Sequence, residues 1–536
     1  MNHDSRTIIG VDVGSGSVRA GIFDLNGTLL AHATRPITLW RETGHIVEQS
    51  SREIWQAVCQ CIKESVARSG VAPASVAGIG FDATCSLVVL DGEGKPLPVG
   101  PSDDPDRNVI VWMDHRATEQ AERINQTGHP VLQYVGGKIS PEMETPKLLW
   151  LKEHRRKIYD RAGQFFDLAD FLTWRATGDA GRSTCTVTCK WTYLAHEKRW
   201  DPDYFRTIGL GDLADEDFVR IGQRIVEPGT PCGNGLTLEA ADEMGLQVGT
   251  PVAIGMIDAH AGGIGTAGVD RGALHNMAWV FGTSACTMMS TEKPVFVPGV
   301  WGPYYSAMVP GLWLNEGGQS AAGAAIDQLV AFHPAAAEAR ELAKVAGVPL
   351  PVFLADRALK SVSSPSAAVA LAQGLHVVPE FLGNRAPFAD PHARAAIAGL
   401  GMERDLDNLV ALYVAGLCGI GYGLRQILET QRENGIKTEK IAISGGAGQN
   451  PLVRQLLADA CGLPILTTVS SEPVLLGSAI LGAVAGKMSP SVRDAMARFT
   501  VLDKQYDPDA GQETVHQQRY EAYKLLQQTA RKLREF

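Results

Sequence analysis

Two glycine-rich loops, one in each half of the chain, have the composition of phosphate-binding turns. Gly14-Ser15-Gly16-Ser17 follows the apolar segment 7–13, and Gly282-Thr283-Ser284 follows the apolar pair 280–281. Glycine has no Cβ, so backbone N–H groups in such loops can approach a phosphate oxygen closely. Phosphoryl transfer needs donors on both sides of the phosphate chain. The pair of loops therefore predicts a duplicated, two-lobed protein that holds a nucleotide between its lobes.

Two aspartates stand at the ends of apolar runs. Asp12 lies within the first run, just before the first loop, where a carboxylate can hold Mg²⁺ beside phosphates. Asp258 follows the run 252–257, and the carboxyl end of a strand near a domain seam suits a general base. Two simpler interpretations stay open: an ordinary tight hairpin for the first loop and a helix N-cap for Asp258.

Further polar residues are candidates for binding a polyol. Trp112, Asp114 and Arg116 form a compact aromatic–acid–base group, although the same pattern also fits an exposed helix start. Lys190 lies in the alternating run 188–192, which we expect to be extended, so its side chain faces either a pocket or solvent. Glu316 precedes a small-residue helix, where an acid is also favoured by the helix dipole.

Several common enzyme motifs are missing from the sequence. It has no Gly-x-x-x-x-Gly-Lys-Ser/Thr loop, no His-Arg-Asp of protein kinases and no Gly-x-Ser-x-Gly elbow. The Gly14-x-Gly16 pair is a weak match to a dinucleotide fingerprint, because residues 18–23 alternate like a strand where that motif needs a helix.

Composition excludes other classes of function. The chain has 536 residues, 45% of them hydrophobic, and a net charge of −10 without a Lys/Arg block, so we expect no nucleic-acid partner. No uninterrupted apolar run approaches the roughly 18–20 residues of a membrane span. The nine cysteines form no Cys-x-x-Cys pair, which favours reduced thiols and a cytoplasmic protein, with Cys185 and Cys189 as small buried hydrophobic residues.

The chain is too long for one hydrophobic core, so we expect two large domains. We place the boundary near residue 268, where a strand–glycine loop–strand pattern restarts. The expected domains are 1–268, 269–490 and a helical appendage, 491–536. The main expected elements are strands 7–13, 18–24, 28–33, 76–81, 87–90, 251–257 and 441–444, a helix over 51–68, and a helix that begins at Asn450 and ends before Gly462.

Taken in order, these segments resemble the FGGY carbohydrate kinase family of the actin-like ATPase superfamily. The resemblance is carried by GVDVGSGSVRAGIFD (10–24), WMDHRA (112–117), ETPKLLWLK (144–152), GMIDAHAGGIG (255–265), VFGTSA (280–285), NEGGQSAAG (315–323), ISGGAGQNPLVRQLLADACGLP (443–464) and SEPVLLGSAILGA (471–483). It spans nearly the whole chain. It implies an α/β fold of two actin-like (ribonuclease H-like) domains with a nucleotide and sugar cleft between them.

The resemblance also implies roles for individual residues, with ATP and Mg²⁺ as cofactors. Asp12 matches the magnesium-site aspartate and Asp258 the catalytic base. The residues implied for the nucleotide are Gly14, Ser15, Ser17, Gly282, Thr283, Gly323, Asp327, Gly446, Ala447 and Asn450. Those expected for the sugar are Thr84, Cys85, Trp112, Asp114, Arg116, Glu144, Lys190, Asp258 and Glu316. The chain departs from many members by having Asp327 in place of Gln and Glu144 in place of a small hydroxyl residue.

The segment Thr84-Cys85-Ser86 resembles the signature of the D-ribulokinase branch. The expected activity is therefore ATP-dependent phosphorylation of a ketopentose at O5, D-ribulose to D-ribulose 5-phosphate. An L-ribulokinase or a xylulokinase is the alternative. In another class, the fold also serves non-catalytic or chaperone-like ATPases and sugar-responsive regulators. The expected partners are a sugar and ATP, without a membrane, in a possible homodimer.

Overall fold

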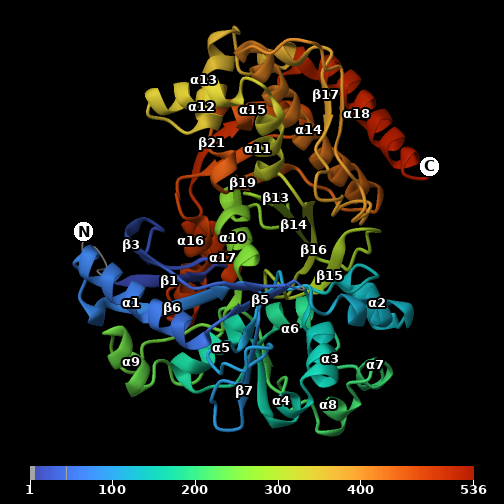
Figure 1. The fold of residues 1–536 in the computed structure, drawn as a ribbon. Helices are drawn as coiled ribbons and strands as arrows, with labels where there is room; N and C mark the ends of the chain where they lie inside the picture. The colour runs from blue at the N-terminus through green and yellow to red at the C-terminus, as the bar shows by residue number, and fades with distance from the viewer. Residues whose placement is uncertain (1–5, 44) are drawn as a thin grey trace.

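The computed structural model describes residues 6–43 and 45–536 and contains two α/β domains, each built on a mixed sheet (Figure 1). The N-terminal sheet has the order β12-β6-β1-β2-β3. Its strands are β1 (Thr7–Val13), β2 (Ser17–Phe23), β3 (Leu29–Pro36), β6 (Val76–Ala83) and β12 (Met256–Ile257). The three strands β1–β3 are antiparallel neighbours, whereas β6 runs parallel to both β1 and β12.

The C-terminal sheet repeats this topology. It has the order β15-β16-β14-β13-β19-β20-β21. The strands β13, β14 and β16 are antiparallel neighbours, and β19 runs parallel to β13 and β20, as in the first sheet. Its strands are β13 (Asn276–Phe281), β14 (Ala285–Thr291), β15 (Trp301–Tyr305), β16 (Trp313–Gln319), β19 (Lys440–Ser444), β20 (Ile465–Thr468) and β21 (Leu502–Tyr506). The two glycine loops therefore join equivalent strands, β1 to β2 and β13 to β14.

Local signals in the sequence account for many of these elements. Every residue of β1 is buried, as its unbroken apolar character predicts. Helix α1 (Ser51–Ser69) begins at Ser50, whose hydroxyl accepts the Glu53 N–H, and ends at Gly70 with a φ of 69°. Its buried face packs on β2 and β3. The expected helix over 51–68 is confirmed.

A third sheet, with the order β4-β5-β8-β7-β9, carries loops of the N-terminal domain. Its strands are β4 (Trp40–Glu42), β5 (Ile46–Gln49), β7 (Leu87–Asp91), β8 (Val109–Ile110) and β9 (Ala162–Asp167). Two small sheets have two strands each. One pairs β10 (Arg182–Ser183) with β11 (Ile225–Val226), and the other pairs β17 (His376–Val378) with β18 (Ala396–Ala398).

Helices surround the sheets of both domains. In the N-terminal half these are α2 (Thr118–Gln126), α3 (Glu144–His154), α4 (Arg156–Arg161), α5 (Leu168–Thr177), α6 (Thr184–Lys190), α7 (Pro202–Thr207), α8 (Gly211–Asp215) and α9 (Leu238–Met244). In the C-terminal half they are α11 (Gly323–Phe332), α12 (Ala336–Val345), α13 (Leu350–Lys360), α14 (Leu406–Glu433), α15 (Pro451–Cys461), α17 (Val492–Phe499) and α18 (Glu513–Leu533). Short 3₁₀ helices are η1 (Pro73–Ser75), η2 (Pro130–Val135), η3 (Val269–Arg271), η4 (Ser366–Ala372), η5 (Gly446–Gly448) and η6 (Ala510–Gln512).

Two helices, α10 (Asp258–Ala267) and α16 (Pro473–Ala485), pack against each other between the two main sheets (Figure 1). Helix α10 follows the N-terminal strand β12 but packs on β13, and α16 packs on β1 and β6. Glycines allow this close contact. A Cβ at Gly477 would lie 1.9 Å from the carbonyl oxygen of Ala261, and one at Gly80 would lie 1.8 Å from that of Ser478. This contact links the two domains.

Three local expectations are wrong. Lys190 ends the helix α6, because the Ser183 side chain caps the Cys185 N–H and a buried helix replaces the expected extended run. Within the expected strand 251–257, only β12 pairs as a strand, and Val252 and Ala253 make isolated bridges. The expected helical appendage contains β21, which extends the C-terminal sheet by pairing with β20.

Helix α14 is long and apolar enough to cross a membrane by length and composition. However, 89% of its most apolar 18-residue window is buried inside the protein. It packs against α11 and α15, with α18 alongside. That burial assigns α14 to the core of the C-terminal domain.

Replacing Gly477 with alanine should lower the melting temperature Tm, because the new methyl group would overlap the Ala261 carbonyl. Overpacking of this kind typically costs about 1–3 kcal/mol. In an isolated helix the same change would stabilise, since alanine is the better helix former. A lower Tm therefore indicates that the backbones touch at Gly477 and Ala261, whereas a higher Tm would indicate that they do not.

The control is Gly92→Ala, since a Cβ at Gly92 meets no heavy atom within 4 Å. Its Tm should match that of the wild type. An unchanged Tm for Gly477→Ala would show that α10 and α16 separate without cost.

Candidate active site

A cavity of about 200 Å³ lies where the two glycine loops face each other. Ser15 of the first loop and Ser284 of the second both line it. Seven residues predicted from the sequence meet in its walls: Ser15, Thr84, Cys85, Trp112, Lys190, Asp258 and Glu316. Ser284 belongs to the second predicted loop, whereas sequence reasoning did not single out five further polar or aromatic residues of the lining: Glu142, His260, Cys286, Trp301 and Arg385. The predicted loops and the predicted base thus belong to one site.

Hydrogen bonds tie the N-terminal wall of the cavity to the first loop. The indole N–H of Trp112 donates to Ser15 Oγ at 2.8 Å. The backbone N–H of Trp112 donates to Ser86 Oγ at 3.1 Å, and Ser86 Oγ lies 3.0 Å from Thr84 Oγ1. The Thr84 N–H in turn donates to the carbonyl of Val13, at the end of β1. The first loop and the wall of the cavity are therefore one hydrogen-bonded unit.

Asp258 is the first residue of α10, and it reaches this position directly from β12. Its Oδ1 accepts the N–H of Ala259 at 2.7 Å. Burial and the neighbouring charge of Asp12 raise the pKa of Asp258 to about 6. A carboxylate with such a pKa is ionised at neutral pH and still basic enough to accept a proton.

Asp12 and Arg19 face each other across β1 and β2 and form an ion pair. Arg19 Nε donates to Asp12 Oδ2 at 2.9 Å, and Arg19 also pairs with Glu472 at 2.6 Å. Beside Asp12, burial and the charge of Asp12 raise the pKa of Asp82 well above its usual range. Ser478 of α16 donates a hydrogen bond to Asp82. The carboxylate of Asp12 is thus held by cross-strand and inter-domain contacts.

The surroundings of Asp12 decide what kind of Mg²⁺ site it could form. Residues 6–43 and 45–536 contain no group of three His, Cys, Asp or Glu side chains that could hold a metal ion. Mg²⁺ in phosphoryl-transfer enzymes, however, is usually held by one or two carboxylates together with waters and substrate phosphates. The buried carboxylate of Asp12 beside the first loop fits that kind of site.

Charged side chains also line the cavity. The ammonium of Lys190 lies 5.5 Å from the centre of the Trp301 ring, and the guanidinium of Arg385 lies 5.6 Å from it. Burial would raise the pKa of Glu316, but the hydrogen bond and charge of His260 lower it to about 2. The cavity therefore presents fixed cations and a fixed carboxylate, which suit the hydroxyl and carbonyl oxygens of a small polar molecule.

A second cavity, of about 410 Å³, adjoins the second glycine loop. Five predicted nucleotide residues line it: Gly282, Thr283, Gly323, Asp327 and Gly446. The rest of its lining is mostly apolar and includes Phe281, Tyr413 and Val453. Glycine backbone at one end and apolar side chains at the other suit the phosphate and base of a nucleotide.

The remaining predicted nucleotide residues lie outside the two cavities. Gly14 and Ser17 close the turn between β1 and β2, where the Gly14 N–H donates to the Ser17 carbonyl. Asn450 caps α15 as expected, since its side chain accepts the Leu452 N–H at 2.8 Å. Ala447 belongs to η5, but its side chain lies outside the described part of the chain.

Three predicted sugar residues are not brought to the cavity. Asp114 and Arg116 form a buried ion-pair cluster with Glu48, in which Arg116 Nη2 lies 2.7 Å from Asp114 Oδ2 and 2.8 Å from Glu48 Oε1. Glu144 is the first residue of α3 and pairs with Lys147 at 3.3 Å. Burial raises the pKa of Glu144 to about 7. These contacts support the fold around the cavity.

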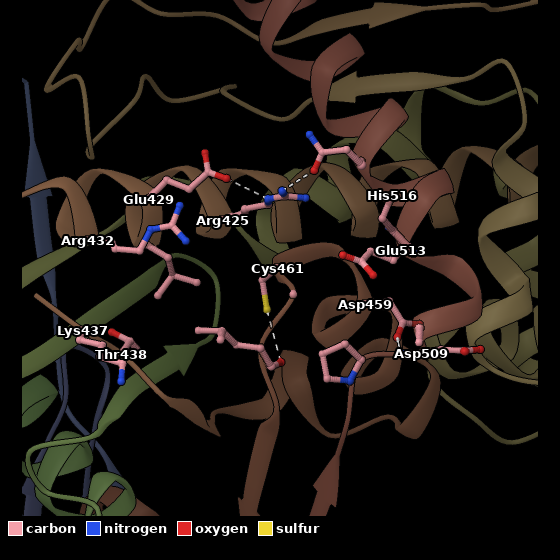
Figure 2. A pocket seen from close by; sticks show the side chains of 16 residues that line it. Arg425, Glu429, Arg432, Lys437, Thr438, Asp459, Cys461, Asp509, Glu513 and His516 are labelled. Atoms are coloured by element: carbon pink, nitrogen blue, oxygen red, sulfur yellow. Dashed lines mark hydrogen bonds and ion pairs between the residues drawn. The ribbon is translucent and has the colours of Figure 1, made fainter.

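A third cavity, of about 450 Å³, lies in the C-terminal domain between α14, α15 and the start of α18 (Figure 2). Arg425 is already paired there, with Glu429 at 3.0 Å and with Gln517 at 2.5 Å. Lys437, also in its lining, is 83% exposed. No residue predicted from the sequence for the nucleotide or the sugar lines this groove.

Comparisons with known proteins agree with this geometry. Residues 7–265 match the N-terminal domain and residues 277–486 the C-terminal domain of the FGGY family of carbohydrate kinases. The chain is 45% identical over 532 residues to the human "FGGY carbohydrate kinase domain-containing protein", covering 97% of this chain and 96% of the relative. It is 38% identical over 523 residues to "D-ribulokinase YDR109C" of Saccharomyces cerevisiae, covering 90% of this chain and 72% of that protein.

Among solved structures, the xylulose kinase from Rhodospirillum rubrum matches with a TM-score of 0.80 and 21% identity, covering 98% of this chain and 99% of that chain. At this level of identity the likeness concerns the fold alone. It confirms the predicted pair of actin-like α/β domains.

Replacing Arg116 with methionine should lower Tm strongly, because it leaves the buried carboxylates of Glu48 and Asp114 without this cation. Breaking a buried pair typically costs about 3–5 kcal/mol. At temperatures where the variant stays folded, the KM for the sugar should not change. The matched control is Arg123→Met, whose ion pair with Glu153 is exposed and worth about 0–1 kcal/mol. A raised sugar KM at an unchanged Tm would instead place Arg116 in sugar binding.

Proposed function

Because the chain belongs to the FGGY family of carbohydrate kinases, we propose that it is an ATP-dependent pentulose kinase that converts D-ribulose to D-ribulose 5-phosphate. The observation that carries the proposal is the common cavity of Asp258, Ser15 and Ser284. A base and both phosphate-binding loops border a space of about 200 Å³, which is large enough for a pentulose. A cavity of this size, with several charged side chains in its lining, favours a small polyol over a protein client.

In the proposed mechanism, the sugar binds with its terminal hydroxyl at Asp258. The carboxylate accepts the hydroxyl proton while the oxygen attacks the γ-phosphorus of ATP in line and ADP leaves. General-base catalysis of this kind typically contributes about 10²–10⁴ in rate. The loops containing Gly14, Ser15 and Ser17 and Gly282 and Thr283 would stabilise the phosphoryl oxygens with hydroxyl and backbone N–H groups of the turns.

The second cavity would hold the rest of the nucleotide. Gly323, Asp327 and Gly446 line it, and we assign the adenosine to the segment that runs from Gly446 through Ala447 to Asn450. Asp12 would hold Mg²⁺, which neutralises charge on the phosphate oxygens when it is bound. Closure of the domains would exclude water and limit wasteful hydrolysis of ATP. A cytoplasmic location is consistent with ATP as co-substrate.

The assignment of D-ribulose has two supports. The first is the 38% identity to a protein named D-ribulokinase. The second is the position of Thr84 and Cys85, which belong to the segment that resembles the D-ribulokinase signature and line the sugar cavity. Lys190 and Glu316 also line that cavity. The family resemblance matches these two residues to a pocket lysine and a pocket glutamate of L-ribulokinases. L-Ribulose is therefore the competing substrate, with D-xylulose as a further alternative.

The proposal is tested by the rate of ADP formation with D-ribulose, L-ribulose, D-xylulose, L-xylulose, ribitol and glycerol. We expect the highest kcat/KM with D-ribulose, because the cavity is bordered by fixed charges that distinguish hydroxyl positions. A higher kcat/KM with another pentulose would make that pentulose the assigned substrate and leave the assignment to the kinase family unchanged. A rate of ATP consumption that no added sugar changes would favour a chaperone-like or regulatory ATPase.

The control for the chemical step is Asp258→Asn, which keeps the shape of the side chain and removes its basicity. Turnover should be abolished, while binding of ATP, measured by calorimetry, should persist. Retained turnover would refute the role of Asp258.

The pH dependence of kcat/KM should report the pKa of the free base. Burial and the charge of Asp12 raise the pKa of Asp258 to about 6, so its active, ionised form is lost as the pH falls through that value. We expect a plateau near neutral pH and a roughly tenfold loss per pH unit below about 6. A profile that stays flat well below pH 6 would mean that another group accepts the proton.

A further inference from the structure

In the wall of the sugar cavity, three side chains from three different elements form a continuous series of hydrogen bonds. Cys185 of α6 has its Sγ 3.0 Å from Nδ1 of His260, which lies two residues after the proposed base on α10. The other nitrogen of the same ring, Nε2, lies 3.3 Å from Oε2 of Glu316 on β16. Cys185 and His260 are at most 1% exposed, so their hydrogen bonds are made inside the protein.

We propose that Cys185 and His260 are positioning residues for the sugar, in which an imidazolium at His260 bridges a thiolate at Cys185 and the carboxylate of Glu316. This chain fixes the orientation of Glu316, whose other hydrogen-bonding capacity faces the cavity. The inference rests on the proposed function, because Glu316 matters only through the sugar that it binds.

The surroundings of the sulfur favour its ionised form. The backbone N–H of Ile257 donates to Cys185 Sγ at 3.4 Å, in addition to the contact with His260. Burial would raise the pKa of Cys185, but the hydrogen bond from Cys189 and the charge of His260 lower it to about 5. Burial would lower the pKa of His260, yet Cys185 and Glu316 raise it to about 10. The contact between Cys185 and His260 contributes to both shifts.

Neighbouring charged groups balance the charges of Cys185, His260 and Glu316. Lys190 and Arg385 approach Glu316 from the cavity side, and Asp258 lies on the same helix as His260. Three anions, Cys185, Glu316 and Asp258, thus accompany the three cations His260, Lys190 and Arg385. If His260 lost its charge, Glu316 would be left with a poorer set of donors, and a buried carboxylate in that state is costly.

The other cysteines differ from Cys185 in this respect. Burial raises the pKa of each of the remaining eight: Cys59, Cys61, Cys85, Cys189, Cys232, Cys286, Cys418 and Cys461. At neutral pH the protein should therefore contain one thiolate per chain. The ionised state of Cys185 can therefore be detected by the ultraviolet absorption of thiolates, without any assay of activity.

The first measurement titrates that absorption in the wild type and in Cys185→Ser from neutral pH downward. We expect one thiolate per chain in the wild type, lost with a midpoint near pH 5, and none in the variant. The control, Cys418→Ser, removes a buried cysteine of α14 and should keep the signal. Absence of a thiolate in the folded wild type overturns the proposal, and so does persistence of the signal in Cys185→Ser.

The second measurement separates positioning from stability. In Cys185→Ser and His260→Gln the KM for the sugar should rise about 10- to 100-fold, the loss expected for a hydrogen bond to a charged group. The KM for ATP should stay unchanged, and kcat should change less than the sugar KM. Cys185→Asp, which restores an anion beside His260, should recover part of the sugar KM. An unchanged sugar KM in Cys185→Ser overturns the positioning role.

The two proposals fail differently. If no pentulose is phosphorylated, the proposed function fails, while the thiolate titration still decides whether the ion pair exists. If D-ribulose is phosphorylated by the wild type and by Cys185→Ser with the same KM, the function stands and the positioning role falls.

Discussion

The packing of α10 against α16 between the two sheets is the contact on which the site depends. Helix α10 begins with Asp258, and α16 begins directly after Glu472, which pairs with Arg19 and through it with Asp12. Because glycines let the backbones touch, these two helix starts have little freedom to move apart. One inter-domain contact therefore sets the positions of both the proposed base and the proposed magnesium ligand.

Burial of like charges is the electrostatic consequence of that packing. Asp12, Asp82 and Asp258 lie close enough for the charge of Asp12 to raise the pKa of the other two. Such a cluster of carboxylates destabilises the protein when no cation or proton is bound to it, and binding of a cation or a proton relieves that cost. Under the proposed function, a bound metal–phosphate complex and the transfer of a proton to Asp258 would both relieve this repulsion.

Local signals predicted much of the fold and part of the site. The glycine loops, the strands beside them, the cap of α15 and Asp258 are each marked by neighbours in sequence, and the structure brings both loops and Asp258 to one cavity. Contacts between residues that lie far apart in the sequence leave no such local signal. Nothing near Asp114 or Arg116 indicates that Arg116 also pairs with Glu48. No motif distinguishes Arg385, which comes to the cavity from a distant part of the chain.

The division between predicted and unpredicted residues has a physical meaning for specificity. Phosphate binding uses backbone groups in glycine turns, which leave a clear pattern in any sequence. Recognition of a sugar uses single side chains that differ by one hydrogen bond between isomers. We expect Glu142, Trp301 and Arg385 to be of this kind, since they come from separate parts of the chain and meet only in the folded cavity. We therefore expect that the choice among pentuloses depends on these scattered side chains, together with Lys190 and Glu316, more than on the shared loops.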